Sequence, residues 1–232
     1  MLEAVMVALD PTPAQERLLL SHAGAARFAY NAGLAHVRAA IEAKEKPEWS
    51  LYGLRRWWNA NKDTLAVNAD GTPWWRENSK EAYSSGLESL ANALSNWVKS
   101  RKGARKGRRM GFPKFKAKDR VTPRFAYTTG RFGLIDGDPK ALRLPKVGRV
   151  HCLENVTERV GGARVLRMTV SRRAGRWYAA LTVERDIPTA ARAPKGGAVG
   201  GNVVSDLERV PARTPCKLQQ SSLQRAKKGD QK

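Results

Sequence analysis

The sequence predicts an α+β fold, with a helical region followed by a small β-barrel or a strongly bent sheet. Apolar residues recur every three or four positions in the first hundred residues, which is typical of amphipathic helices. From about residue 121 the segments become short and β-branched and are separated by glycine-containing turns. The chain also carries 43 Lys and Arg against 21 Asp and Glu, a net charge of +22 over 232 residues. These observations predict a basic protein built of two unlike regions.

The charge indicates a polyanionic partner, because a strongly cationic surface attracts polyanions and releases their condensed counterions on binding. Nucleic acid is the first candidate and an anionic membrane surface the second. No stretch approaches the roughly 20 apolar residues of a spanning helix, so we expect no membrane partner. The first ten residues carry Glu3 and Asp10 and lack the basic start of a signal peptide, which favours a cytoplasmic protein.

The first element expected is a strand over residues 2–9 (LEAVMVAL), followed by a turn and a long helix. Thr12 can cap this helix, Pro13 suits its first position, and Gln15 lies three residues after Thr12, which is the spacing of a capping box. One apolar stripe follows along the later part of the helix, at Tyr30, Leu34, Val37 and Ile41.

Two further helices are expected before residue 100. One covers about 51–62 and includes Trp57 and Trp58. The other begins after Asn78 or Ser79, either of which can cap it, and carries an apolar stripe. The stripe consists of Tyr83, Leu87, Leu90, Leu94 and Trp97. Tryptophan at helical spacing is usually buried, so we interpret these aromatic residues as core rather than as platforms for bases.

A basic run follows from 99 to 120, with eleven Lys and Arg and a single acid, Asp119. Glycines and a proline interrupt it, so we expect an exposed segment without stable helix. The alternative to a nucleic-acid contact is a solvated linker. Phe112 and Phe115 within the run favour the contact, since an aromatic ring between cations can stack on a base while its neighbours hold phosphates. The expected binding residues are Arg101, Lys102, Arg105, Lys106, Arg108, Arg109, Phe112, Lys114, Phe115, Lys116 and Lys118.

Six short strands are expected after this run, over 125–128, 131–135, 142–144, 149–153, 165–171 and 177–184. The last two flank a basic hairpin tip, which adds Arg172, Arg173 and Arg176 to the expected binding residues. From 186 to 201 the composition shifts to Ala, Pro and Gly, which indicates a domain boundary. The two cysteines, Cys152 and Cys216, are too few for a zinc ribbon and are interpreted as small apolar side chains.

Six segments in a fixed order resemble the TnpB/OrfB family, the insertion-sequence proteins related to type V CRISPR effectors. They are PTPAQERLLL, ARFAYNAGL, PWWRENSKEAYSSGLESLANAL, GFPKFKAKDR, LRLPKVGRV and TVSRRAGRWYAALTVE. The resemblance implies a wedge-type β-barrel with a helical recognition domain inserted after its first strand, followed by an RNase H-like nuclease domain. It also implies a guide RNA transcribed from the element's end and a target DNA that the guide pairs with.

The resemblance sets the expected domains. Residues 1–12 form the first barrel strand and turn, 13–98 the helical recognition domain, 99–120 a basic linker and 121–187 the rest of the barrel. Residues 188–232 are expected to be a vestigial, poorly ordered start of the nuclease domain.

The nuclease chemistry of the family depends on carboxylates that hold two magnesium ions. Asn202 stands where the first metal-binding Asp is expected, and an amide is a poor substitute for a carboxylate at such a site. The later acidic residues and the zinc ribbon of the family have no counterpart in the sequence. We therefore expect no catalytic residue, no metal site and no cofactor.

Three functions remain open from the sequence. The first is a truncated, cleavage-deficient transposase-family protein that binds a guide RNA and target DNA. The second is an active RNA-guided DNA endonuclease that serves DNA transposition, against which Asn202 argues. The third is a generic basic RNA-binding scaffold, against which the six ordered segments argue. The sequence does not indicate an oligomeric state.

Overall fold

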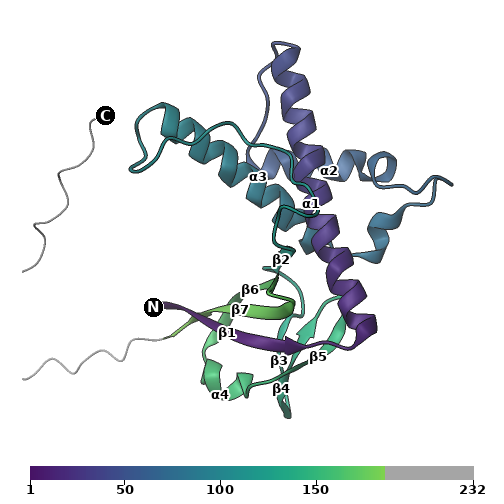
Figure 1. The fold of residues 1–232 in the computed structure, drawn as a ribbon, viewed down its shortest axis with the longest axis vertical. Helices are drawn as coiled ribbons and strands as arrows, with labels where there is room; N and C mark the ends of the chain where they lie inside the picture. The colour runs from purple at the N-terminus through teal and green to yellow at the C-terminus, as the bar shows by residue number, and fades with distance from the viewer. Residues whose placement is uncertain (186–232) are drawn as a thin grey trace, which may run out of the picture. The chain divides into compact units, whose positions relative to one another are not determined.

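A computed structural model describes residues 1–185 of the chain and shows helices above a β-sheet (Figure 1). The vestigial nuclease start expected at 188–232, with Asn202 and Cys216, lies outside the described residues. The α+β class is confirmed. The strands are β1 (Leu2–Asp10), β2 (Arg124–Tyr127), β3 (Gly133–Ile135), β4 (Asp138–Leu144), β5 (Gly148–Cys152), β6 (Arg164–Arg173) and β7 (Arg176–Glu184).

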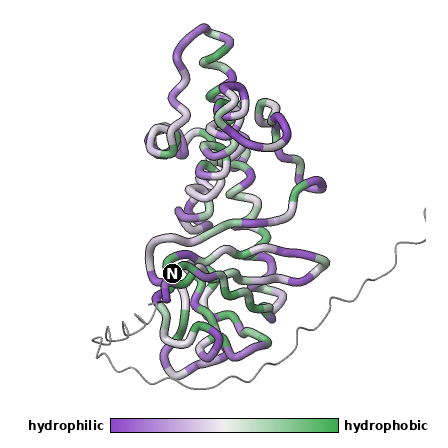
Figure 2. The backbone as a smooth tube through the Cα atoms, turned by 90° about the vertical axis from the view of Figure 1, so that its left-hand side faces the viewer, coloured by the Kyte–Doolittle hydropathy of each residue, from purple (hydrophilic) through white to green (hydrophobic). Residues whose placement is uncertain are grey.

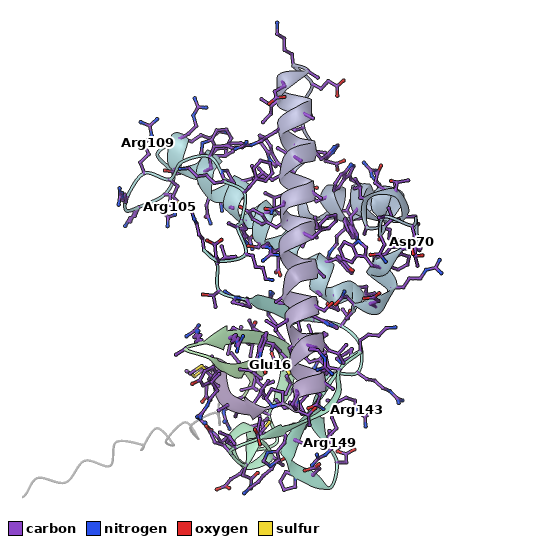
Figure 3. All side chains as sticks on the ribbon, turned by 45° about the vertical axis from the view of Figure 1, so that its right-hand side comes forward. Glu16, Asp70, Arg105, Arg109, Arg143 and Arg149 are labelled. Carbon is purple, nitrogen blue, oxygen red and sulfur yellow. The ribbon has the colours of Figure 1, made fainter. Side chains whose placement is uncertain are left out.

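The long helix α1 (Pro13–Glu42) begins as its sequence predicts. The Thr12 hydroxyl accepts the Gln15 N–H, and the Gln15 side chain accepts the Thr12 N–H in return, which completes the capping box. The Gln15 amide also donates to the Arg149 carbonyl at 2.6 Å and so ties the start of the helix to β5. Thirty residues at 1.5 Å each make α1 about 45 Å long, which carries it from the sheet past the other helices (Figure 3).

Helix α3 (Lys80–Arg101) packs closely on α1 because of its glycine. A Cβ at Gly86 would lie 2.0 Å from the Ala26 carbonyl oxygen, so only glycine allows the two backbones this approach. Ser79 caps α3, as one of the two expected candidates. The apolar stripe from Tyr83 to Leu94 is buried, as predicted.

The shorter helix α2 (Leu51–Leu65) adds aromatic residues to this core. Trp58 is buried and stacks on Tyr83 with ring centroids 5.0 Å apart, which confirms it as a core residue. Trp57 is half-buried and stacks on His36 at 4.6 Å. A short 3₁₀ helix, η1 (Trp74–Glu77), precedes α3 and was not predicted.

The seven strands form one antiparallel sheet in the order β2-β6-β7-β1-β5-β4-β3. β1 pairs with β7 over the register from Leu2↔Glu184 to Leu9↔Trp177, and it meets β5 only at Leu9 and Asp10. All six strands expected after residue 121 are present, within a few residues of the predicted bounds. In Figure 2 the strands carry much of the hydrophobic (green) backbone, while the helical region alternates between hydrophilic and hydrophobic positions.

The predicted closure into a β-barrel is not confirmed. β2 and β3 lie at opposite ends of the strand order, and no ladder joins them within residues 1–185. These end strands have four and three residues, so they offer few backbone groups for a closing ladder. β2 packs instead toward α3: the two threonines after it donate to the Glu81 carboxylate, with Thr128 Oγ1 at 2.7 Å and Thr129 Oγ1 at 2.8 Å.

Two local predictions also need correction. Helix α3 continues to Arg101, so the first cations of the basic run lie in its last turn, where they interact favourably with the helix dipole. A short helix, α4 (Val156–Val160), occupies a stretch where no element was expected. Its signals were visible in the sequence, because Asn155 caps it and Gly161 ends it with a φ of 59°.

Candidate nucleic-acid interface

A groove with a cavity volume of about 890 Å³ lies between α1, α3, the segment 110–126 and β6. One carboxylate, Glu88 of α3, lines it, together with six cations that come from the other three walls. The cations are Arg27, Lys116, Lys118, Arg124, Arg167 and Arg172. A concave surface with this excess of positive charge concentrates its field on an anion and suits a phosphate backbone.

Helix α3 presents a polar stripe to this groove. Ser85, Ser89, Asn92 and Asn96 follow one another at spacings of four, three and four, and all line the cavity. Each residue of the polar stripe comes two positions after a residue of the buried apolar stripe. At 100° per residue this places the two stripes on roughly opposite faces of the helix. Hydroxyl and amide groups along a cationic groove can donate to phosphate and sugar oxygens.

Two of the groove's arginines are already paired with carboxylates. The Arg167 guanidinium of β6 donates two hydrogen bonds to the Glu88 carboxylate of α3, at 2.8 and 2.6 Å. Arg172 pairs with Glu16 of α1 at 2.9 Å. These pairs join the sheet to the helices, so both arginines contribute to the frame of the groove. Within the described residues, the other four cations of the groove have no ion pair.

Lys116 is held in place by both helices. The Asn31 side chain of α1 bonds to the backbone of Lys116, accepting its N–H at 2.8 Å and donating to its carbonyl at 3.0 Å. The ammonium donates to Ser89 Oγ at 3.0 Å and lies 3.7 Å from the centroid of the Tyr30 ring. Burial and the neighbouring charge of Arg124 lower the pKa of Lys116 to about 8. The amine is thus a positioned group rather than a freely moving surface cation.

The two phenylalanines of the basic run have different surroundings. Phe112 is half-buried and meets Trp97 edge-on, with ring centroids 5.0 Å apart. Phe115 is 51% exposed, and the Arg38 guanidinium lies 4.8 Å from its centroid. Phe112 therefore belongs to the helical core, whereas Phe115 is available to a ligand.

Most of the expected binding cations lie outside the groove, at the end of α3 and on the loop that follows it. This loop is closed by a hydrogen bond from the Met110 N–H to Ser100 Oγ at 2.9 Å. Figure 3 shows Arg105 and Arg109 at its outer side, pointing away from the helices. The exposed cations of this stretch are Arg101, Lys102, Arg105, Lys106, Arg108, Arg109 and Lys114.

The structure brings only part of the expected set together. Lys116, Lys118 and Arg172 line the groove. Arg173 and Arg176 are exposed at the turn between β6 and β7 and do not line it.

Sequence reasoning missed Arg27, Arg124 and Arg167, because each is an isolated cation outside the basic run. The polar stripe on α3 was visible as a spacing, but such a stripe usually marks a solvated helix face.

Two buried groups, His22 and Cys152, have structural roles. His22 is buried: its Nε2 accepts the Ser79 N–H at 3.1 Å, so Nδ1 carries the proton that it donates to the Leu18 carbonyl at 2.8 Å. Burial lowers the pKa of His22, which keeps the ring neutral. Burial likewise raises the pKa of Cys152 to about 11, consistent with the expected small apolar residue.

Among residues 1–185 no three His, Cys, Asp or Glu side chains gather into a group that could hold a metal ion. None of the helices described is both long and apolar enough to cross a membrane.

Fold and groove together define a basic α+β protein with a cationic cleft suited to polyanions. The model of the OrfB/IS605 helix-turn-helix domain matches residues 1–46. In the structure this stretch is a strand followed by one continuous helix, α1.

Two relatives from strains of Mycobacterium tuberculosis, each named “Putative RNA-guided DNA endonuclease”, are 39% identical over 193 residues. That match covers 78% of this chain and 42% of each relative. The protein InsQ of Escherichia coli, named in the same way, is 28% identical over 188 residues, which cover 81% of this chain and 42% of InsQ. The chain thus spans less than half the length of these relatives. With the six ordered segments, these matches identify it as a member of the TnpB/OrfB family.

Proposed function

We propose that this chain is a cytoplasmic nucleic-acid-binding protein that holds an RNA transcribed from its own mobile element together with target DNA. The groove between α1, α3, the segment 110–126 and β6 carries the proposal, because six cations and one carboxylate line it. The names of the relatives support RNA and DNA as the two polyanions. In such a complex the guide reads the sequence by base pairing, while the protein contacts backbone and shape.

The groove offers two kinds of contact to a strand. Arg27, Lys118 and Arg124 supply charge, while the polar stripe of α3 supplies neutral donors that add hydrogen bonds without adding charge. Phe115, outside the groove, adds a ring on which one base can stack. Charge, hydrogen bonds and stacking are the usual components of single-strand and heteroduplex binding.

We further propose that the chain does not cleave DNA by itself, and needs neither magnesium nor zinc for binding. The expected lack of cleavage rests on Asn202, which stands where a metal-binding aspartate is expected, and the lack of a zinc requirement on the two cysteines, which are too few for a zinc ribbon. The alternative is an active endonuclease, which is the activity that the relatives' names give to the relatives. Incubating the chain with its co-purified RNA, magnesium and a matching DNA duplex decides between the two. Intact DNA supports the proposal, and magnesium-dependent cuts overturn it.

The binding proposal is tested by co-expressing the chain with the transcript that flanks its gene and sequencing the RNA that stays bound. One defined RNA species is expected. A mixture of unrelated RNAs that is removed by salt would instead identify a generic basic scaffold.

A triple variant locates the interface. Arg27→Gln, Lys118→Gln and Arg124→Gln together remove three groove cations, and Arg17→Gln, Lys140→Gln and Arg164→Gln remove the same charge from exposed positions outside the groove. The groove variant is expected to reduce the slope of log K against log salt by about two to three units, since each phosphate contact contributes roughly 0.7 to 0.9. The control should change the slope by less than one unit. Equal effects in the two variants would remove the groove from the interface.

A further inference from the structure

Lys116 faces more positive than negative charge in the groove. From α1 it meets Arg27 and the Tyr30 ring, and from α3 it meets Ser89 and Glu88. Its own segment adds Lys118, and the sheet adds three arginines. These are Arg124 from β2, with Arg167 and Arg172 from β6.

Among the described residues no carboxylate forms an ion pair with Lys116 or with Arg124. Glu88, the one acid of the groove, is occupied by both nitrogens of the Arg167 fork. Arg172 has its own partner in Glu16. Two like charges close together in a partly buried place repel each other, and an anion bound between them removes that repulsion.

The position of the amine is also unusually well defined for a lysine. Asn31 clamps its backbone from both sides, while Ser89 and the Tyr30 ring orient the ammonium. Folding has therefore already ordered much of the Lys116 side chain. Ligand binding loses less side-chain entropy here than at a freely moving lysine. A positioned cation beside a guanidinium matches a phosphate, to which Arg presents its planar fork and Lys a point charge.

We infer that Lys116 and Arg124 together hold one phosphodiester of the bound strand, with the ammonium and the guanidinium as donors to its two free oxygens. The inference rests on the proposed function and adds to it a particular phosphate site in the groove. Lys116 differs in this from Lys114 and Lys118 of the same segment, which are exposed.

Binding at this site is linked to protonation. Burial and Arg124 hold the pKa of Lys116 at about 8 in the free protein, and a bound phosphate raises it because the negative charge favours the ammonium. Near pH 7 the amine is already protonated and binding needs no proton. Above pH 8 the free amine is mostly neutral, so each binding event takes up a proton and the affinity falls. From pH 7 to pH 9 the expected loss is about tenfold.

The test measures the dissociation constant of a single strand made only of adenine and cytosine, whose bases do not titrate in this range. The measurements run at pH 7, 8 and 9 and constant ionic strength. Wild type should weaken about tenfold across the range. Lys116→Arg should show no dependence on pH, because its guanidinium stays charged. Lys140→Arg, the control at an exposed lysine outside the groove, should weaken as wild type does. A parallel fall in Lys116→Arg and wild type would overturn the site.

A second measurement needs no variant. Calorimetric titration of wild type at pH 9 in two buffers of different ionisation enthalpy gives the protons taken up per strand bound. About 0.9 proton is expected for a group with a pKa near 8, and about 0.1 at pH 7. No uptake at pH 9 would overturn the inference.

The two failures can be told apart. If no defined RNA stays bound to the chain, the proposed function fails, and if the groove triple variant binds as wild type does at pH 7, the groove is not the interface. If binding depends on the groove but shows no proton uptake, only the phosphate site fails.

Discussion

Glu81 is a buried carboxylate that joins the helical region to the sheet. It is 8% exposed and accepts from the Thr128 N–H at 3.0 Å and from the hydroxyls of Thr128 and Thr129. Burial alone would raise the pKa of Glu81, but the hydrogen bonds from the two threonines outweigh it and lower the pKa below its ordinary 4.5. The charged form is therefore the one that stabilises the fold.

We expect Glu81→Gln to destabilise the protein by about 1–3 kcal/mol at pH 7, because the amide nitrogen cannot accept a hydrogen bond. The contribution is complete above pH 4.5, the ordinary value, and is lost as the pH falls through the lower pKa of the folded state. Urea denaturation at several pH values checks this: the gap between wild type and variant should narrow below pH 4.5. Glu42→Gln, at an exposed position on α1, is the control and should change little. A gap that does not depend on pH would contradict this role of the charge.

Phe112 and Phe115 form a second matched pair at the residue scale. Phe115→Ala should cost about 1–3 kcal/mol in binding to an oligonucleotide, if a base stacks on this exposed ring, and should leave the melting temperature unchanged. Phe112→Ala should lower stability, because it removes a ring packed on Trp97. Fluorescence anisotropy and thermal unfolding of both variants separate the two effects. Normal binding by Phe115→Ala would exclude that ring as a platform.

At the scale of elements, the crossing of α1 and α3 depends on one glycine. Helix propensity alone predicts that Gly86→Ala stabilises by about 1 kcal/mol. Packing opposes this, because the new Cβ would lie 2.0 Å from the Ala26 carbonyl and the helices would have to separate. We expect packing to dominate and the variant to lose about 1–3 kcal/mol or more.

Gly24, on α1, is the control for this substitution. A Cβ there meets nothing within 4 Å, so Gly24→Ala should follow propensity and stabilise by up to about 1 kcal/mol. Chemical denaturation of both variants tests the crossing, and stabilisation by Gly86→Ala would show that the helices separate easily.

The ends of the helices were the part of the elements that the sequence predicted best. The capping box at Thr12 and the cap at Ser79 act through hydrogen bonds within a few residues, so their spacing alone specifies them. The closed barrel failed for the opposite reason. Whether β2 pairs with β3 depends on the twist and curvature of all seven strands together. The spacing of residues within one strand does not specify that curvature.

At the scale of the whole molecule, the described residues carry two cationic surfaces, a shaped groove and an open loop. Replacing Arg105, Lys106, Arg108 and Arg109 by Gln should weaken binding to all nucleic acids alike and reduce the salt slope by at most about one unit for each phosphate that these cations neutralise. Folding stability should not change, since these side chains are exposed. Binding of unrelated oligonucleotides over a salt series measures this. Weaker binding of one RNA alone would instead give the loop a role in selection.

The sequence by itself determined the fold class, the seven strands, the three long helices and the family, and it predicted a polyanionic partner. Each of these depends on composition or on contacts between near neighbours. Only the tertiary structure decided that Phe112 packs on the core while Phe115 is exposed, that the sheet stays unclosed, and that Arg27, Lys116 and Arg124 line the same groove. Those three cations come from α1, the connecting segment and β2, nearly a hundred residues apart at the extremes. They line one groove because the helices pack on the sheet. The spacing of residues along the sequence does not reveal that packing.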